Sequence, residues 1–116
     1  MEILPNADKA VIPVEKFTKY ALDLESVDGK HKAVVFRDVL GYTVSNASVL
    51  VAKIKEGVLN SPATFRGASE FGDSYEIIMD IEGANGRTAK VVTGWMIDKN
   101  KDYPRLVTAY VEKKKR

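Results

Sequence analysis

The stretch YEIIMDIEGANGRTAKVVTGWMI, residues 75–97, decides the fold of this chain. Apolar and β-branched residues alternate or cluster on both sides of Asn85-Gly86. This dipeptide is the strongest short-range signal for a β-hairpin, because Asn and Gly tolerate the positive φ angles of a two-residue turn. A third strand is predicted over 104–110, PRLVTAY, and a weak one over 64–66. The sequence therefore predicts an antiparallel meander of three or four strands.

A two-residue loop at Asn85-Gly86 would also set the register of the hairpin. In that register Met79 lies opposite Val92, and Glu76 lies opposite Trp95. One face of the sheet is then apolar and holds Tyr75, Ile77, Met79, Ile81, Val92, Met96, Val107 and Ala109. The other face is mixed and holds Glu76, Ile78, Asp80, Glu82, Val91, Thr93, Trp95, Leu106, Thr108 and Tyr110. We expect amphipathic helices to cover the apolar face.

The first half of the chain carries helical patterns. One short helix is predicted over 13–22 and a second over 30–39, while Ser45 and Asn46 are good caps for the start of a third. The buried stripe expected on the first helix is Phe17, Tyr20, Ala21 and Leu24. The buried face expected on the third is Ala47, Leu50, Val51, Ile54 and Val58. The fold class is therefore α+β, with two to three N-terminal helices packed on one face of a three- to four-stranded antiparallel meander sheet.

The length and the charge distribution of the chain predict one small domain with a basic C-terminal end. The chain has 116 residues, enough for a single core, and it has no cysteine for a disulfide or a thiolate site. Lys113 to Arg116 carry four of the eighteen Lys and Arg residues, so residues 1–111 hold 14 basic and 15 acidic residues. We predict a single α+β domain over 1–111 and a basic C-terminal tail over 112–116. Such a terminal run is more often a solvated end than the folded basic stripe of a nucleic-acid binder.

Targeting and cofactor signals are absent from the sequence. No apolar run approaches the roughly 18 residues that span a membrane, and MEILP at the N-terminus lacks the basic start and apolar core of a signal peptide. We therefore expect a cytoplasmic protein without membrane contact. One histidine, no cysteine and no glycine-rich phosphate loop predict that the chain has neither a metal site nor a nucleotide cofactor.

One of two functional hypotheses, the alternative, is RNA cleavage without a metal. That reaction needs a base for the ribose 2′-hydroxyl, an acid for the leaving oxygen, and cationic or hydrogen-bonding groups around the phosphate. His31 would be the general acid or base, because imidazole ordinarily titrates near neutrality. The groups expected around the phosphate are Arg87, Thr93, Thr108 and Tyr110. Two observations oppose this reading: a lone histidine near an apolar stripe is more often packed, and the carboxylates predicted on the open face would repel RNA.

The function that the sequence favours is a non-catalytic module, of bacterial or mobile-element origin, that binds or inhibits a protein partner, because the body of the chain is near neutral; RNA cleavage is the alternative. The contact surface would then be either a sheet edge or the face with Trp95 and Tyr110, since aromatic rings supply large contact area with few torsions to freeze. Lys32 and Arg105 are further candidates for binding. Trp is mostly buried wherever it occurs, so packing of Trp95 in the core is the alternative. RNA remains the other possible partner, and the sequence leaves the oligomeric state open.

Four motifs spread over nearly the whole chain carry a family resemblance. They are LPNA at 4–7, GKHKA at 29–33, NGRT at 85–88 and PRLVTAY at 104–110. With these motifs the chain resembles a small bacterial family of domains of unknown function, in which Arg is commoner where Lys30 stands. Members of that family occur alone or as the last module of bacterial or phage-linked proteins, which implies a mobile-element effector or toxin. Helices followed by an antiparallel sheet are also similar, at fold level, to the barnase, EndoU, colicin and RelE group of RNases.

Overall fold

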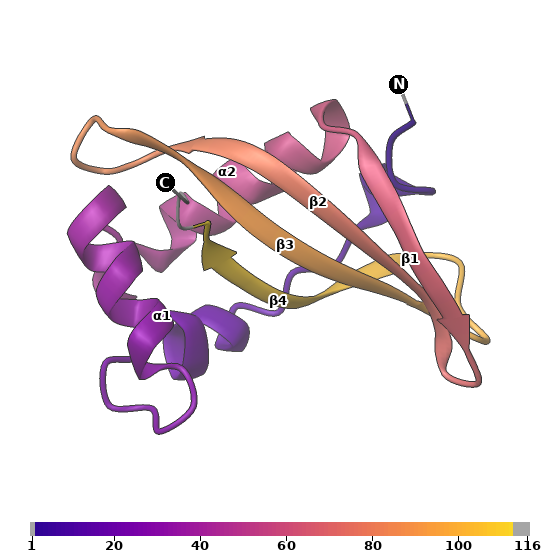
Figure 1. The fold of residues 1–116 in the computed structure, drawn as a ribbon, viewed down its shortest axis with the longest axis horizontal. Helices are drawn as coiled ribbons and strands as arrows, with labels where there is room; N and C mark the ends of the chain where they lie inside the picture. The colour runs from indigo at the N-terminus through magenta and orange to yellow at the C-terminus, as the bar shows by residue number, and fades with distance from the viewer. Residues whose placement is uncertain (1, 113–116) are drawn as a thin grey trace.

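The computed structural model describes residues 2–112 and has the predicted α+β class. Its single antiparallel sheet has the strand order β1-β2-β3-β4. The strands are β1 Ala63–Ser69, β2 Gly72–Glu82, β3 Thr88–Asp98 and β4 Pro104–Val111. This confirms the predicted meander, and the weak strand at 64–66 is longer than expected. Figure 1 shows a twisted sheet with α2 behind it and α1 beside the end of β4. The predicted basic tail, apart from Glu112, lies outside the described residues.

The two main helices begin and end as the sequence predicts. Helix α1, Lys30–Val35, continues into the π-helical segment η3, Phe36–Leu40, and ends at Gly41 with the positive φ of 75° typical of a glycine C-cap. Helix α2, Ala47–Asn60, follows the 3₁₀ turn η4, Val44–Asn46. The residues that α2 buries are Ala47, Leu50, Ile54 and Val58, four of the five predicted.

The first predicted helix is shorter than expected. The 3₁₀ turn η1, Ala7–Lys9, precedes it, and the segment 13–22 forms mainly the π-helical turn η2, Phe17–Ala21. Phe17 and Ala21 are buried as predicted, but Leu24 is 39% exposed and does not belong to the buried stripe. Upstream of η2, Val11 forms a parallel bridge with Arg105 of β4. This bridge covers one part of an edge strand and holds η2 alongside β4.

The hairpin between β2 and β3 has a three-residue loop, so the predicted two-residue turn is wrong. The Gly83 amide donates to the Arg87 carbonyl oxygen at 2.6 Å, and the Gly86 amide donates to the Gly83 carbonyl oxygen at 3.1 Å. Only Gly86 in the loop has a positive φ, 87°. A turn closed by one such glycine is the usual three-residue hairpin. Met79 consequently pairs with Val91 rather than Val92.

Contacts with the end of the helical segment explain the longer loop. The Asn85 side-chain amide donates to the Val39 carbonyl oxygen at 3.1 Å, and the Asn85 backbone amide donates to the Leu40 carbonyl oxygen at 3.4 Å. At Gly83 a β-carbon would lie 2.3 Å from the Leu40 carbonyl oxygen. These partners are more than forty residues away in the sequence, so local turn preferences could not reveal them.

The one-residue shift exchanges the two faces of β3. Trp95 is 1% exposed and Thr93 is fully buried, so their predicted place on the open face is wrong. Val91 also lies in the core, while Val92 and Met96 lie on the open face, where Val92 is still only 5% exposed. The Thr93 hydroxyl donates to the Ile77 carbonyl oxygen and accepts from the Trp95 indole, both at 2.8 Å. The two buried polar side chains are therefore satisfied inside the core.

A β-bulge changes the first half of β4. Gly94 pairs with Thr108, but the next residue, Trp95, pairs with Leu106. The extra residue, Val107, is 37% exposed, and Leu106 is fully buried, the reverse of what we predicted for both. Beyond the bulge the prediction is confirmed: Ala109 is buried, while Thr108 and Tyr110 stay on the open side.

No single helix in residues 2–112 has both the length and the apolar character needed to cross a membrane; only the pair Lys30–Leu40 and Val44–Asn60, bent by 66°, meets these criteria together.

Candidate functional site

Lys32 joins three elements at the outer edge of β4. Its Nζ donates to Oγ1 of Thr108 at 3.0 Å and to the Tyr20 hydroxyl at 3.4 Å. The same ammonium lies 4.9 Å from the centre of the Tyr20 ring and 5.6 Å from that of Tyr110. Helix α1 thus supplies the cation, η2 one aromatic wall, and β4 the second wall and a hydroxyl. We call Lys32, Tyr20, Thr108, Tyr110 and the neighbouring His31 the Lys32 cluster.

The charge of Lys32 has no carboxylate partner among residues 2–112. An ammonium has three N–H donors, and the two hydroxyls account for two of them. Aromatic faces attract a cation through their quadrupole, but they carry no net negative charge. Lys32 is also half-buried, which limits its contact with water. The cluster can therefore bind an anion through both the positive charge of Lys32 and its remaining N–H donor.

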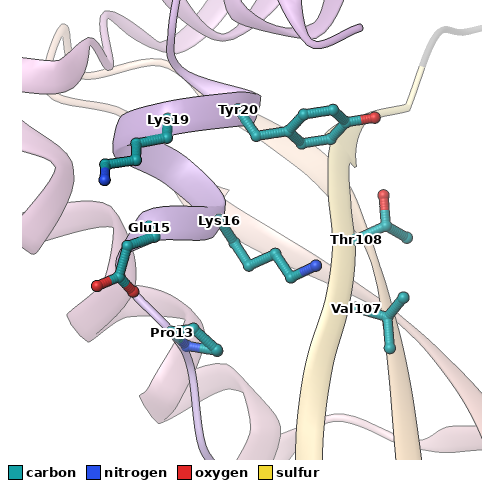
Figure 2. Close-up of a pocket in the computed structure, with 7 residues that line it drawn as sticks. All are labelled: Pro13, Glu15, Lys16, Lys19, Tyr20, Val107 and Thr108. Carbon is teal, nitrogen blue, oxygen red and sulfur yellow. The ribbon is translucent and has the colours of Figure 1, made fainter.

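Two cavities flank the cluster along β4. The first, of about 570 Å³, is lined by Pro13, Glu15, Lys16, Lys19, Tyr20, Val107 and Thr108. Figure 2 shows Lys16 reaching toward β4, with the Tyr20 and Thr108 hydroxyls close to the strand, while Glu15 and Lys19 point away from it. The second, of about 380 Å³, is lined by His31, Lys32, Val35, Tyr110 and Val111. His31, Lys32 and Tyr110 therefore line one space.

Four of the predicted site residues, His31, Lys32, Thr108 and Tyr110, meet in this cluster. Arg87 does not: it lies at the hairpin tip, where Nη1 donates to the Asp38 carbonyl oxygen at 3.4 Å. Thr93 and Trp95 lie in the core. Tyr20 was expected only as a core residue, and Lys16 was not singled out, because nothing near them in the sequence indicates that η2 lies beside β4.

Arg105, predicted to bind a partner, is held in an ion pair. Its Nε donates to Oδ2 of Asp98 at 2.7 Å and its Nη2 donates to Oδ1 at 3.2 Å. This hydrogen-bonded guanidinium holds the pKa of the Asp98 carboxyl below its usual value. The fork geometry joins the strands β3 and β4 near their turn, and it occupies the side chain that we had assigned to binding.

Three of the four acidic side chains of β2 are paired with neighbouring cations. Ion pairs join Glu76 to Arg66, Asp80 to Lys90, and Glu82 to Lys53. We had expected these carboxylates to repel a polyanion. Each is paired, so the face they occupy presents alternating charges rather than a block of negative charge.

Together, the fold and the cluster define a small α+β domain with a cationic, aromatic-walled site at the edge of its sheet. The chain belongs to the family described as Domain of unknown function (DUF6883), whose model matches residues 3–113. Comparison with curated proteins and with solved structures gave no significant match. The expected likeness to the barnase, EndoU, colicin and RelE group therefore has no support from these comparisons.

Proposed function

We propose that this domain is a metal-independent RNase and that the Lys32 cluster is its catalytic site. One observation carries the proposal: His31, Lys32 and Tyr110 line the same cavity, and the Lys32 ammonium has no carboxylate partner within residues 2–112. These are a base, an acid and a cation, the three parts that cleavage at a ribose 2′-hydroxyl requires. Trp95, on which the alternative of a protein-binding face mainly rested, is buried.

The reaction assigns one role to each group. His31 removes the proton from the 2′-hydroxyl, and the 2′-oxygen attacks phosphorus. The bond from phosphorus to the 5′-oxygen breaks as the Tyr110 phenol donates its proton to that oxygen. The products are a 2′,3′-cyclic phosphate and a 5′-hydroxyl end, and the imidazolium returns its proton to the phenolate through water.

Lys32 acts on the charge that develops at phosphorus. Its ammonium has one donor left for a non-bridging oxygen, and Thr108 fixes its position through the 3.0 Å hydrogen bond. A preorganised cation in a partly desolvated site stabilises the phosphorane more than the ground-state diester. Lys16 would attract the neighbouring phosphate of the chain, since Figure 2 shows it reaching toward the same strand.

The ion pairs on β2 remove the main electrostatic objection to RNA as the substrate. The proposal includes a cytoplasmic site of action, which suits an RNA substrate and a chain without cysteine. It also includes the effector or toxin role, of bacterial or mobile-element origin, that the family resemblance suggested.

The test is cleavage of an end-labelled, single-stranded oligoribonucleotide by purified protein in the presence of a chelator. We expect His31→Ala and Lys32→Met each to lower the rate at least about a hundredfold. Lys55→Met is the matched control, because it removes one charge from the exposed side of α2 and should leave the rate unchanged. The product should carry a 2′,3′-cyclic phosphate.

RNA that stays intact at high protein concentration would overturn the proposal, as would wild-type cleavage by His31→Ala. If RNA stays intact while a protein partner is retained by Lys55→Met and lost by Lys32→Met, the binding-module alternative replaces it.

A further inference from the structure

A third cavity lies on the open face of the sheet and shares two residues with the Lys32 cluster. It has a volume of about 230 Å³, and its lining includes Val92, Gly94, Met96, Arg66, Glu76 and Ser74. Thr108 and Tyr110 also line it, and both belong to the Lys32 cluster. Because Tyr110 borders both spaces, a ligand with an anionic end at Lys32 could place its other end here. We call this cavity the Gly94 hollow.

The absence of a side chain at Gly94 creates the hollow. Val92 and Met96 flank Gly94 on the same face of β3, and a β-carbon at Gly94 would lie 2.9 Å from Cγ2 of Thr108. The bulge in β4 adds to the effect, because it turns Leu106 into the core rather than toward the hollow. Val92 and Met96 therefore supply an apolar floor on either side of Gly94, and the aromatic residue Tyr110 lines the hollow beside them.

The rim of the hollow combines one donor group with one acceptor group. Nη2 of Arg66 donates to Oε1 of Glu76, which leaves Oε2 of the carboxylate and the remaining N–H groups of the guanidinium for a ligand. An apolar floor and an aromatic wall suit a flat ring, and a paired donor and acceptor suit the edge of a nucleobase. Guanine matches this rim best, since O6 accepts while the adjacent N1–H and N2–H₂ donate.

We propose that the Gly94 hollow binds the nucleobase next to the reacting phosphate and that it prefers guanine. This inference rests on the proposed function, because it takes the phosphate at Lys32 as the anchor. The hollow is too small for a folded partner, and its continuity with the cluster through Tyr110 and Thr108 determines which base of a bound chain would reach it.

The test measures binding of the four 3′-nucleoside monophosphates and of inorganic phosphate by NMR titration at low salt. We expect 3′-GMP to bind most tightly. Glu76→Gln and Ser74→Phe, which fills the hollow, should each weaken 3′-GMP binding about tenfold or more and leave phosphate binding unchanged. Lys32→Met should weaken both ligands.

Asp80→Asn is the matched control, because Asp80 lies on the same strand and face as Glu76, is also ion-paired, and does not line the hollow. Equal binding of all four nucleotides, or unchanged 3′-GMP binding in Glu76→Gln, would overturn the inference. The two proposals fail separately. RNA cleaved without base preference contradicts only the hollow, whereas tight 3′-GMP binding without cleavage contradicts only the RNase.

Discussion

The Nζ of Lys32 lies 3.0 Å from Oγ1 of Thr108, and this contact ties helix α1 to the edge strand β4. The two residues are 76 positions apart in the chain. Their contact closes the space between the helices and the sheet at one point and leaves a cavity on each side of it. The position of the proposed catalytic cation thus depends on the packing of the whole domain.

Thr108→Val should weaken both stability and cleavage. The substitution keeps the shape of the side chain and removes a hydrogen bond to a charged group in a partly buried position, for which a loss of about 1–2 kcal/mol is expected. Urea denaturation measures the free energy of unfolding. Thr88→Val, at an exposed position of β3, should change it by less than about 0.5 kcal/mol. A double-mutant cycle with Lys32→Met should show a coupling energy, and strict additivity would contradict the contact.

Thr93→Val should destabilise the domain by about 2–3 kcal/mol. The change leaves the Trp95 indole N–H and one lone pair of the Ile77 carbonyl oxygen without their partner inside the core. Denaturation midpoints, with Thr88→Val again as the comparison, measure the effect. The same register predicts a Trp95 fluorescence that acrylamide quenches poorly. A red-shifted, readily quenched emission would indicate that Trp95 is exposed and would contradict the observed register.

Two glycines of one loop should respond differently to alanine. Gly83→Ala should lower the free energy of unfolding by more than about 3 kcal/mol. The new β-carbon would lie 2.3 Å from the Leu40 carbonyl oxygen, a backbone atom that cannot move aside. Gly86→Ala meets no atom within 4 Å and should cost only about 1 kcal/mol, for the positive φ of 87°. Thermal unfolding of both variants gives the comparison. Equal losses would indicate that the loop does not dock on the helix end.

Tyr42 should make the domain sensitive to alkaline pH. Burial raises the pKa of its phenol, whose hydroxyl donates to the Glu82 carbonyl oxygen at 2.6 Å. A group whose folded pKa is raised contributes stability that is complete below the unfolded pKa of about 10, and this stability is lost as the pH rises through the folded pKa. Tyr42→Phe should lower the free energy of unfolding by about 1 kcal/mol at neutral pH. Above pH ~10 the free energy of unfolding of this variant should fall less steeply than that of the wild type. Parallel pH curves for the two proteins would contradict this assignment.

The sequence alone determined which segments become helices and strands. Strand alternation from Tyr75 to Ile97, the caps before α2 and the glycine after Leu40 act within a few residues of chain, so they can be read locally. The same locality explains why four of the five residues of the Lys32 cluster were predicted as site residues: two short motifs, GKHKA and PRLVTAY, carry His31, Lys32, Thr108 and Tyr110.

Only the tertiary structure decided the register of the sheet and the composition of the site. The loop that sets the register is lengthened by contacts of Asn85 and Gly83 with a helix end formed by Val39 and Leu40. A side-chain period of two converts that single extra residue into an exchange of faces, which moved Trp95 from the surface to the core. Tyr20 joined the cluster for the same kind of reason: packing brings η2 against β4, and no local pattern encodes a contact between residues so far apart.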